Sequence, residues 1–298
     1  MLIALEKLIN ELRHLKDEGV EAVHCREETL EGFKEVLKTW NLQSENVPAV
    51  VRYEGAEKKE YPSVMVTEVV SEMVNVEKIP EAPIVELPSG NKKMQWEWLR
   101  ARVLNCPVCN EHVKSGKKVV FGVGSLDADI FFCGEAPGAD EEIKGEPFVG
   151  KAGQLLTKII QAMGLSREKV YIGNIMNWRP EMPTVFGNRP PTQTEMNFCL
   201  PYLRGQVEII KPKVIVALGA TAVSGLLGSD NTRRMGDIRG KWHEFEGIPL
   251  MITFHPSYLL RNNTLKAKRM VWEDMLQVME RIKMPINGKQ QKYFLSEV

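Results

Sequence analysis

Four short apolar runs alternate with segments of helical periodicity in the C-terminal two thirds of the chain. The runs cover residues 129–134, 170–174, 213–219 and 250–254. Strands that alternate with helices form a parallel sheet whose two faces are covered by those helices. The pattern therefore predicts an α/β fold: a three-layer α/β/α sandwich with a central, mainly parallel four-stranded sheet.

The segments between these runs carry helix signals. Thr192 and Glu195 have the spacing of a capping box at a helix start. Further helices are expected after Gly219 and from Met270 to Ile282. One helical face, which ends at Gly164, is made by Leu155, Leu156, Ile159, Ile160 and Met163.

The first 90 residues differ in composition from the rest. Residues 2–15 and 30–40 show apolar helical stripes, and a β-like run lies at 64–66. Prolines, a glycine and a lysine pair between residues 77 and 93 are typical of a linker. We predict a small α or α+β module over residues 1–90 and a catalytic domain over residues 91–298. The role of the module is open, with binding of another protein as one alternative.

Composition narrows the class of protein. The 298 residues are 43% hydrophobic and 26% charged, as in ordinary soluble proteins, and the formal net charge is zero. Zero net charge argues against broad nucleic-acid binding, although residues 233–241 and 261–269 hold local basic clusters. An early charged pair and the lack of a long apolar run predict a cytoplasmic protein without membrane association. We also expect a monomer. Five cysteines in a reducing compartment favour metal or core roles over disulfides.

Polar and acidic residues follow two of the predicted strands. The first strand runs into Gly134-Glu135-Ala136-Pro137-Gly138, and the fourth ends at His255. Ligands bind open α/β sheets beyond the carboxyl ends of the strands. We therefore expect the functional site at this end of the sheet.

Five blocks, in order along the chain, resemble family 4 of the uracil-DNA glycosylase superfamily. They are Cys106–Cys109 with 119–124, Gly134–Gly138 with Glu141 and Glu142, Gly145–Leu156, Tyr171–Ile175 continuing to Arg179–Pro180 and Gly187–Arg189, and His255–Ser257. The resemblance implies hydrolysis of the N-glycosidic bond of uracil in DNA, which leaves an abasic site for base excision repair. It also implies a monofunctional enzyme, since no lysine stands in a motif position to form a Schiff base.

The resemblance assigns a uracil-binding role to five residues. Phe148 would stack on a base flipped out of the DNA. Asn174 would read its edge, because an amide has both a donor and an acceptor. His255 would bind the uracil and, as a catalytic residue, stabilise the negative charge on the departing base. Gly134 and Ala136 would line the same pocket.

The residue that positions the attacking water is left open among Glu135, Glu141 and Asn188. Ala136 stands where some other branches of the superfamily carry an aspartate. Gly138 stands where other branches carry a bulky tyrosine, so the exclusion of thymine is expected to be looser.

The segment after His255 resembles a DNA-gripping turn. Pro256 and Ser257 would hold the DNA backbone. Leu259, Leu260 or Arg261 would fill the gap that the flipped base leaves.

Family 4 members commonly hold an iron–sulfur (4Fe-4S) cluster on four cysteines. Cys106, Cys109 and Cys199 match three of these ligands, but Trp178 stands at the remaining position and has no ligand atom. Three interpretations stay open: the cluster is absent and the thiols pack as small apolar groups, Cys133 replaces the missing ligand, or three protein ligands hold the cluster. The chemical step needs no cofactor in any of them.

Two other functions remain alternatives. A glycosylase of the same fold could act on another deaminated or 5-substituted base, which the small Gly138 favours. The chain could also be a catalytically silent nucleic-acid-binding protein.

Overall fold

The computed structural model describes residues 79–180 and 189–295. All of them belong to one compact unit, Asn75–Val298. The helices expected at 2–15 and 30–40, the β-like run at 64–66 and Asn188 lie outside the described residues. The N-terminal module and its boundary near residue 90 therefore stay predictions.

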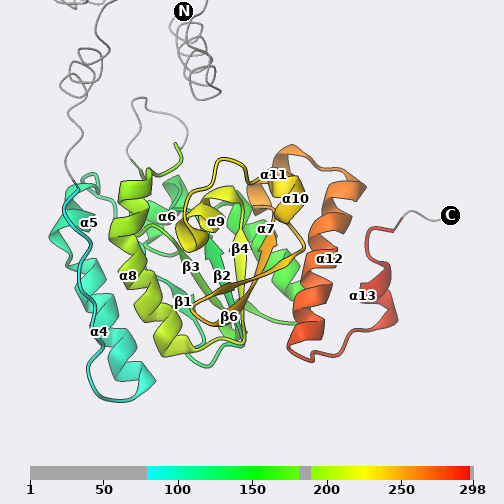
Figure 1. Cartoon of the computed structure of the whole chain (residues 1–298), viewed down its shortest axis with the longest axis horizontal. Helices are drawn as coiled ribbons and strands as arrows, with labels where there is room; N and C mark the ends of the chain where they lie inside the picture. Colours follow the sequence, from blue (N-terminus) through cyan, green and yellow to red (C-terminus); the bar gives the residue numbers. More distant parts are fainter. Residues whose placement is uncertain (1–78, 181–188, 296–298) are drawn as a thin grey trace, which may run out of the picture. The chain divides into compact units, whose positions relative to one another are not determined.

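The centre of the unit is a six-stranded sheet of order β1-β3-β2-β4-β6-β5 (Figure 1). The strands are β1 (Val123–Gly124), β2 (Ile130–Gly134), β3 (Tyr171–Asn174), β4 (Val214–Leu218), β5 (Trp242–Phe245) and β6 (Ile248–Thr253). β3, β2, β4 and β6 are parallel neighbours, which confirms the four predicted strands.

The expectation of only four strands was wrong, because β1 and β5 add an antiparallel strand at each edge. β1 has two residues and only Phe245 of β5 is buried. Neither strand therefore has an apolar run that sequence inspection can detect.

The described helices are α4 (Lys92–Leu104), α5 (Pro107–Glu111), α6 (Ala139–Lys144), α7 (Lys151–Ala162), α8 (Gln193–Ile210), α9 (Ala220–Leu227), α10 (Met235–Ile238), α11 (Pro256–Arg261), α12 (Leu265–Arg281) and α13 (Gly288–Lys292), with a 3-10 turn η1 (Arg167–Lys169). α8 begins with the predicted capping box, in which the Glu195 N–H donates to Thr192 Oγ1 at 3.2 Å. None of these described helices has the length and apolar character needed to cross a membrane.

Alternate residues of each central strand point to opposite faces of the sheet. Phe131 and Cys133 of β2 join the core that α4, α8 and α9 cover. Ile130 and Phe132 join the core beneath α7 and α12. Figure 1 shows α4 and α8 on one side of the sheet and α12 on the other. The predicted three-layer sandwich is therefore confirmed.

Residues 79–90 form neither helix nor strand, as their composition indicates, but they are fixed to the domain. Val85 and Leu87 pack against the α4–α8 core. Arg102 Nη2 donates to the Ile84 carbonyl at 3.0 Å, and Gln95 Nε2 donates to the Pro88 carbonyl at 2.9 Å. This part of the expected linker thus lies along α4.

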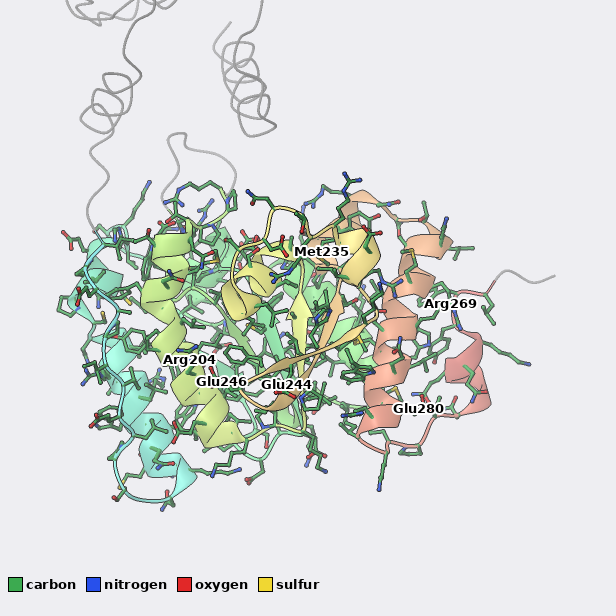
Figure 2. All side chains as sticks on the ribbon, in the orientation of Figure 1. Arg204, Met235, Glu244, Glu246, Arg269 and Glu280 are labelled. Carbon is green, nitrogen blue, oxygen red and sulfur yellow. The ribbon has the colours of Figure 1, made fainter. Side chains whose placement is uncertain are left out.

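The turn between β5 and β6 contacts α8. Glu246 and Gly247 both have positive φ, 51° and 76°, which closes the tight hairpin. Arg204 of α8 pairs with Glu246 at 2.9 Å, and Figure 2 shows the two side chains at the amino end of β6. The pair is exposed and contributes little stability. The pair lies at the amino end of β6, whereas the residues of the candidate site lie at the carboxyl end of the sheet.

Candidate active site

β2 and β3 end on the same register pair, Gly134 and Asn174. Backbone pairing continues beyond it, because the Ile175 N–H donates to the Gly134 carbonyl at 2.9 Å and the Met176 N–H donates to the Glu135 carbonyl at 3.0 Å. This extension fixes the start of the acidic turn beside the end of β3.

Phe148 and Asn174 converge above Gly134. A Cβ atom built on Gly134 would lie 2.4 Å from Phe148 Cζ and 2.5 Å from Asn174 Oδ1. Any side chain at this position would displace the ring or the amide. Glycine therefore keeps the space between them open, and three predicted site residues meet at one point.

Asn174 presents an unpartnered polar atom to this space. The residue is 7% exposed, and its Oδ1 is buried without a hydrogen-bond partner among the described residues. An unsatisfied buried acceptor costs about 1–3 kcal/mol, so such groups are commonly kept for a ligand. The amide is suited to accept a hydrogen bond from a bound molecule.

The backbone around Phe148 is held by Glu141. Phe148 has φ 53°, an unusual conformation for a non-glycine residue. Glu141 Oε1 accepts from the N–H groups of Val149 at 2.8 Å and Gly150 at 2.9 Å, and Oε2 accepts from the Gly138 N–H at 3.1 Å. Both carboxylate oxygens are thus bound to backbone N–H groups.

Arg167 holds the same loop from the other side. Its Nη1 donates to the Phe148 carbonyl at 3.0 Å and its Nη2 to the Pro147 carbonyl at 2.9 Å. Phe148 as a residue is 6% exposed. The aromatic surface is therefore fixed by hydrogen bonds on both sides of its backbone.

Glu135 has different surroundings from Glu141. Burial raises the pKa of its carboxyl, and a hydrogen bond from the Thr221 hydroxyl opposes that shift. Thr221 was not identified from the sequence. The sequence feature that could have identified it is a polar side chain just beyond the carboxyl end of β4, at the same edge of the sheet as the other site residues. The carboxyl of Glu135 therefore differs from that of Glu141, whose oxygens are bound to backbone N–H groups.

His255 precedes α11 as its N-cap. The Ser257 N–H donates to His255 Nδ1 at 3.1 Å, and the Ser257 hydroxyl lies 2.8 Å from the same nitrogen. Burial, with the charge of Arg261, lowers the pKa of His255 to about 4. The ring is therefore neutral at neutral pH, and with Nδ1 as acceptor the proton is assigned to Nε2.

The rings of His255 and Phe148 lie 5.7 Å apart between centroids, at 35°. A hydrogen-bond donor, an aromatic face and an amide thus meet at the ends of β2, β3 and β6. A scan against family models matches residues 121–276 to the uracil DNA glycosylase superfamily. The chain belongs to this superfamily.

Three relatives are Type-4 uracil-DNA glycosylases. The protein from Thermotoga maritima is 43% identical over 180 residues, which are 60% of this chain and 90% of the relative. The protein from Pyrobaculum aerophilum is 38% identical, over 59% of this chain and 89% of the relative. The protein from Archaeoglobus fulgidus is 39% identical, over 56% and 83%. The chain therefore spans most of each of these superfamily members.

The DNA-contacting residues expected of this superfamily separate into buried and exposed ones. Leu259 is 5% exposed and packs in a small core with Ala267 and Val271, whereas Leu260 is 47% exposed. A side chain held in that core is not available to enter a base stack. Leu260 and Arg261, which are both exposed, therefore stay candidates for the gap-filling role. Pro256 is buried, and Ser257 is bound to His255 as described above.

The cysteines expected to hold a superfamily cluster contact one another. Cys109 is hydrogen-bonded to Cys106 and to Cys199, and all three are buried. The hydrogen bond with Cys109, followed by burial, raises the pKa of the Cys106 thiol above its ordinary value. Buried cysteines that contact one another can pack as small apolar groups.

Trp178, at the position expected for the remaining ligand, lies in the core. It is fully buried, stacks on His112 at 4.9 Å and meets the edge of Phe198 at 6.0 Å. Its Nε1 has no hydrogen-bond partner among the described residues.

Cys133, the alternative ligand, contacts the Gly134 carbonyl at 3.7 Å, and burial raises the pKa of its thiol. Within residues 79–180 and 189–295, no group of three or more Cys, His, Asp or Glu side chains has the arrangement of a metal site. The described donors therefore do not fit a cluster that needs four thiolates.

Proposed function

We propose that this chain is a uracil-DNA glycosylase that hydrolyses the N-glycosidic bond of uracil in DNA and leaves an abasic site. The observation that carries the proposal is the meeting of Phe148 and Asn174 above Gly134, with the ring of His255 facing Phe148. Membership of the superfamily and the names of the Type-4 relatives support it. The enzyme would act in base excision repair.

The pocket would select the base by stacking and by one fixed amide. A uracil lying on Phe148 places its N3–H against the unpartnered Oδ1 of Asn174 and its O4 against the amide nitrogen. Cytosine presents an acceptor at N3 and a donor at N4, so both contacts would be mismatched. A wrongly paired buried edge costs about 1–3 kcal/mol.

Bond cleavage would depend on two groups. As the bond between the sugar C1′ and uracil N1 breaks, its electron pair moves into the base, and His255 Nε2–H donates a hydrogen bond to uracil O2. Removing one such donor costs about 10²–10³-fold in rate in comparable sites. Glu135 accepts a proton from the water whose oxygen bonds to C1′, and its raised pKa brings it nearer to neutral pH.

Glu141 and Asn188 are placed differently in this scheme. We propose that Glu141 positions Phe148, since both of its oxygens are occupied by backbone N–H groups. Asn188 remains a candidate for water positioning and lies outside the described residues.

The DNA would contact α11 and its surroundings. Leu260 would fill the gap left by the base, while Arg261 and the turn at Pro256 and Ser257 would contact the backbone. Single-stranded and mismatched uracil should be good substrates, since both lower the cost of extruding the base. We propose a monomer acting on cytoplasmic DNA, with residues 1–90 available to bind a protein.

The cofactor expectation remains separate from this chemistry. No step proposed here uses an iron–sulfur cluster, and the described donors do not fit one. Iron and sulfide content, measured on protein purified without oxygen, tests that expectation.

The proposed activity is tested with a labelled single-stranded oligonucleotide that carries one uracil, followed by alkali. Strand breaks at the uracil, absent with a thymine control and with His255→Ala, are the expected result. Breaks at another base in a panel of deaminated and 5-substituted bases would favour the alternative specificity that Gly138 suggests. Tight binding without any abasic product, by folded protein, would instead support a silent binding role.

A further inference from the structure

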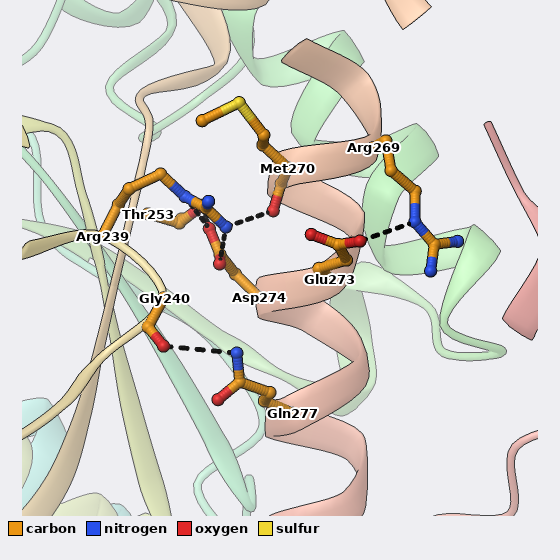
Figure 3. Close-up of polar contacts among 8 residues, drawn as sticks. All are labelled: Arg239, Gly240, Thr253, Arg269, Met270, Glu273, Asp274 and Gln277. Atoms are coloured by element: carbon orange, nitrogen blue, oxygen red, sulfur yellow. Dashed lines mark hydrogen bonds and ion pairs between the residues drawn. The ribbon is translucent and has the colours of Figure 1, made fainter. Parts of the chain in front are cut away.

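A buried ion pair joins α12 to the end of β6. Asp274 is fully buried and the Arg239 side chain is 13% exposed. Asp274 Oδ2 accepts from Arg239 Nε at 3.1 Å and from the Thr253 hydroxyl at 2.6 Å, while Oδ1 accepts from Arg239 Nη2. Figure 3 shows the three side chains meeting between the strand and the helix. Among the residues that the structure describes, these are the donors that satisfy the buried carboxylate.

The segment that carries Arg239 is closely fitted to the same carboxylate. Arg239 Nη2 also donates to the Met270 carbonyl at 2.5 Å. Gly240 has φ 69°, and a Cβ atom built on it would lie 2.8 Å from Asp274 Oδ1. The Gly240 N–H donates to the Ile252 carbonyl at 2.8 Å, and Gln277 Nε2 donates to the Gly240 carbonyl at 3.2 Å.

The pair fixes the two residues that precede His255. Thr253 is bound through its hydroxyl to Asp274. The Arg239 guanidinium lies 5.9 Å from the centroid of the Phe254 ring, within the range of a cation–π contact. His255, the proposed catalytic histidine, directly follows Thr253 and Phe254.

The same strand end also fixes His255 against β4. The Gly219 N–H donates to the Thr253 carbonyl at 2.9 Å. A Cβ atom built on Gly219 would lie 2.9 Å from His255 Cβ, so the histidine passes close to the end of β4. A shift of Thr253 would therefore move His255 relative to the pocket.

We propose that Asp274 and Arg239 are positioning residues for His255, acting through Thr253 and Phe254. The inference rests on the proposed function for its catalytic consequence, but the position of His255 can be measured without activity. A buried pair of this kind is weak evidence for stability by itself, whereas its contacts define one geometry for the strand end.

Residue 273, which directly precedes Asp274 in α12, provides a matched control. Glu273 has the same carboxylate chemistry, but it is exposed and pairs with Arg269 at 2.9 Å on the far side of α12 (Figure 3). Glu273→Gln and Asp274→Asn thus make the same chemical change on the exposed and the buried side of one helix. Thr253→Val removes only the hydroxyl at nearly constant volume, and Thr253→Ser restores it.

The experiment measures excision under single-turnover conditions with saturating uracil oligonucleotide, well below the melting temperature of every variant. Thr253→Val and Asp274→Asn should lower the rate constant about 10- to 100-fold, the effect of a small misplacement of a catalytic group. The Kd for DNA should change less than about twofold, because phosphate contacts supply most of the affinity. Thr253→Ser and Glu273→Gln should keep the wild-type rate.

The second readout is the NMR signal of the His255 ring in DNA-free protein. The shifts and pKa of His255 should change in Thr253→Val and stay unchanged in Glu273→Gln. An unchanged ring signal and rate in folded Thr253→Val would overturn the proposal, even if Asp274→Asn failed to fold. If the wild type released no uracil, the proposed function would fail, and the ring signal would still decide the positioning role.

Discussion

Glu141 accepts a hydrogen bond from the backbone N–H of Val149 at 2.8 Å, directly after Phe148. This contact separates two glutamates that sequence reasoning had treated alike. Glu141 holds the backbone of the loop, whereas Glu135 is partly buried beside Thr221 and is the glutamate that we propose for the chemistry.

Glu141→Ala should destabilise the protein by about 1–3 kcal/mol, because three backbone N–H groups lose their acceptor. Glu135→Gln should change the free energy of unfolding by less than about 1 kcal/mol and still reduce excision. Urea unfolding and excision assays on both variants check the contrast. Equal stability losses in the two variants would remove the distinction between their roles.

Asn174→Ala should reduce uracil excision by about 10- to 100-fold, since one variant loses both polar contacts to the base. The fold should be retained, because Oδ1 has no partner among the described residues to lose. Single-turnover rates and far-UV circular dichroism measure the two effects. Near-normal excision by a folded variant would exclude Asn174 from base recognition.

The partly buried, neutral His255 should make stability depend on pH. Its pKa is lowered to about 4 in the folded protein, against about 6.5 in an unfolded chain. Between these values the unfolded state binds more protons, so the free energy of unfolding falls as pH falls from about 6.5 to about 4. Urea unfolding at pH 7 and pH 5 should show a larger loss in the wild type than in His255→Asn. The same loss in both proteins would contradict the assignment.

Leu260→Ala should lower excision from duplex DNA more than from single strands, because only a duplex has a gap to fill. Its stability should stay within about 0.5 kcal/mol of the wild type, as for other exposed positions. Leu259→Ala provides the control and should cost about 2–5 kcal/mol through loss of core packing. Comparing both substrates and both variants distinguishes the two leucines. A duplex-specific defect in Leu259→Ala alone would reverse the assignment.

Trp178→Cys should allow the chain to bind iron and sulfide, since it supplies a fourth thiol in the same buried core as Cys106, Cys109 and Cys199. Metal analysis and visible absorption after anaerobic purification measure the gain. Trp178→Phe keeps an aromatic residue without adding a thiol and should bind none. A full cluster in the wild-type protein would show that Trp178 does not prevent binding.

Sequence predicted the features that depend on strong local patterns. β2 and β4 are almost entirely apolar because both faces of the sheet are covered, and α8 begins with the capping box that its sequence predicts. β5 escaped detection because its burial depends on pairing with β6 at an edge, which no local pattern records.

The sequence identified most residues of the candidate site but did not separate the roles of residues with the same chemistry. Glu135 and Glu141 have the same chemistry, and only the loop around Phe148 separates them. Asp274 could have been noticed, since it stands on the apolar stripe of α12 with Val271, Met275 and Val278. An acidic residue on such a stripe needs a buried partner, but its partner Arg239 lies 35 residues away in sequence.

The Phe148 loop is bound on one side by Glu141 and on the other by Arg167, with Phe148 at φ 53°. The Phe148 surface, which we propose to meet the base, is therefore already formed in the DNA-free structure, and the loop at Phe148 need not become ordered around the substrate. Binding then costs mainly the freedom of the nucleotide, as expected for a preorganised site. Selection among bases would then depend on a rigid pocket, which binds a poorly fitting base weakly because it does not change shape around it.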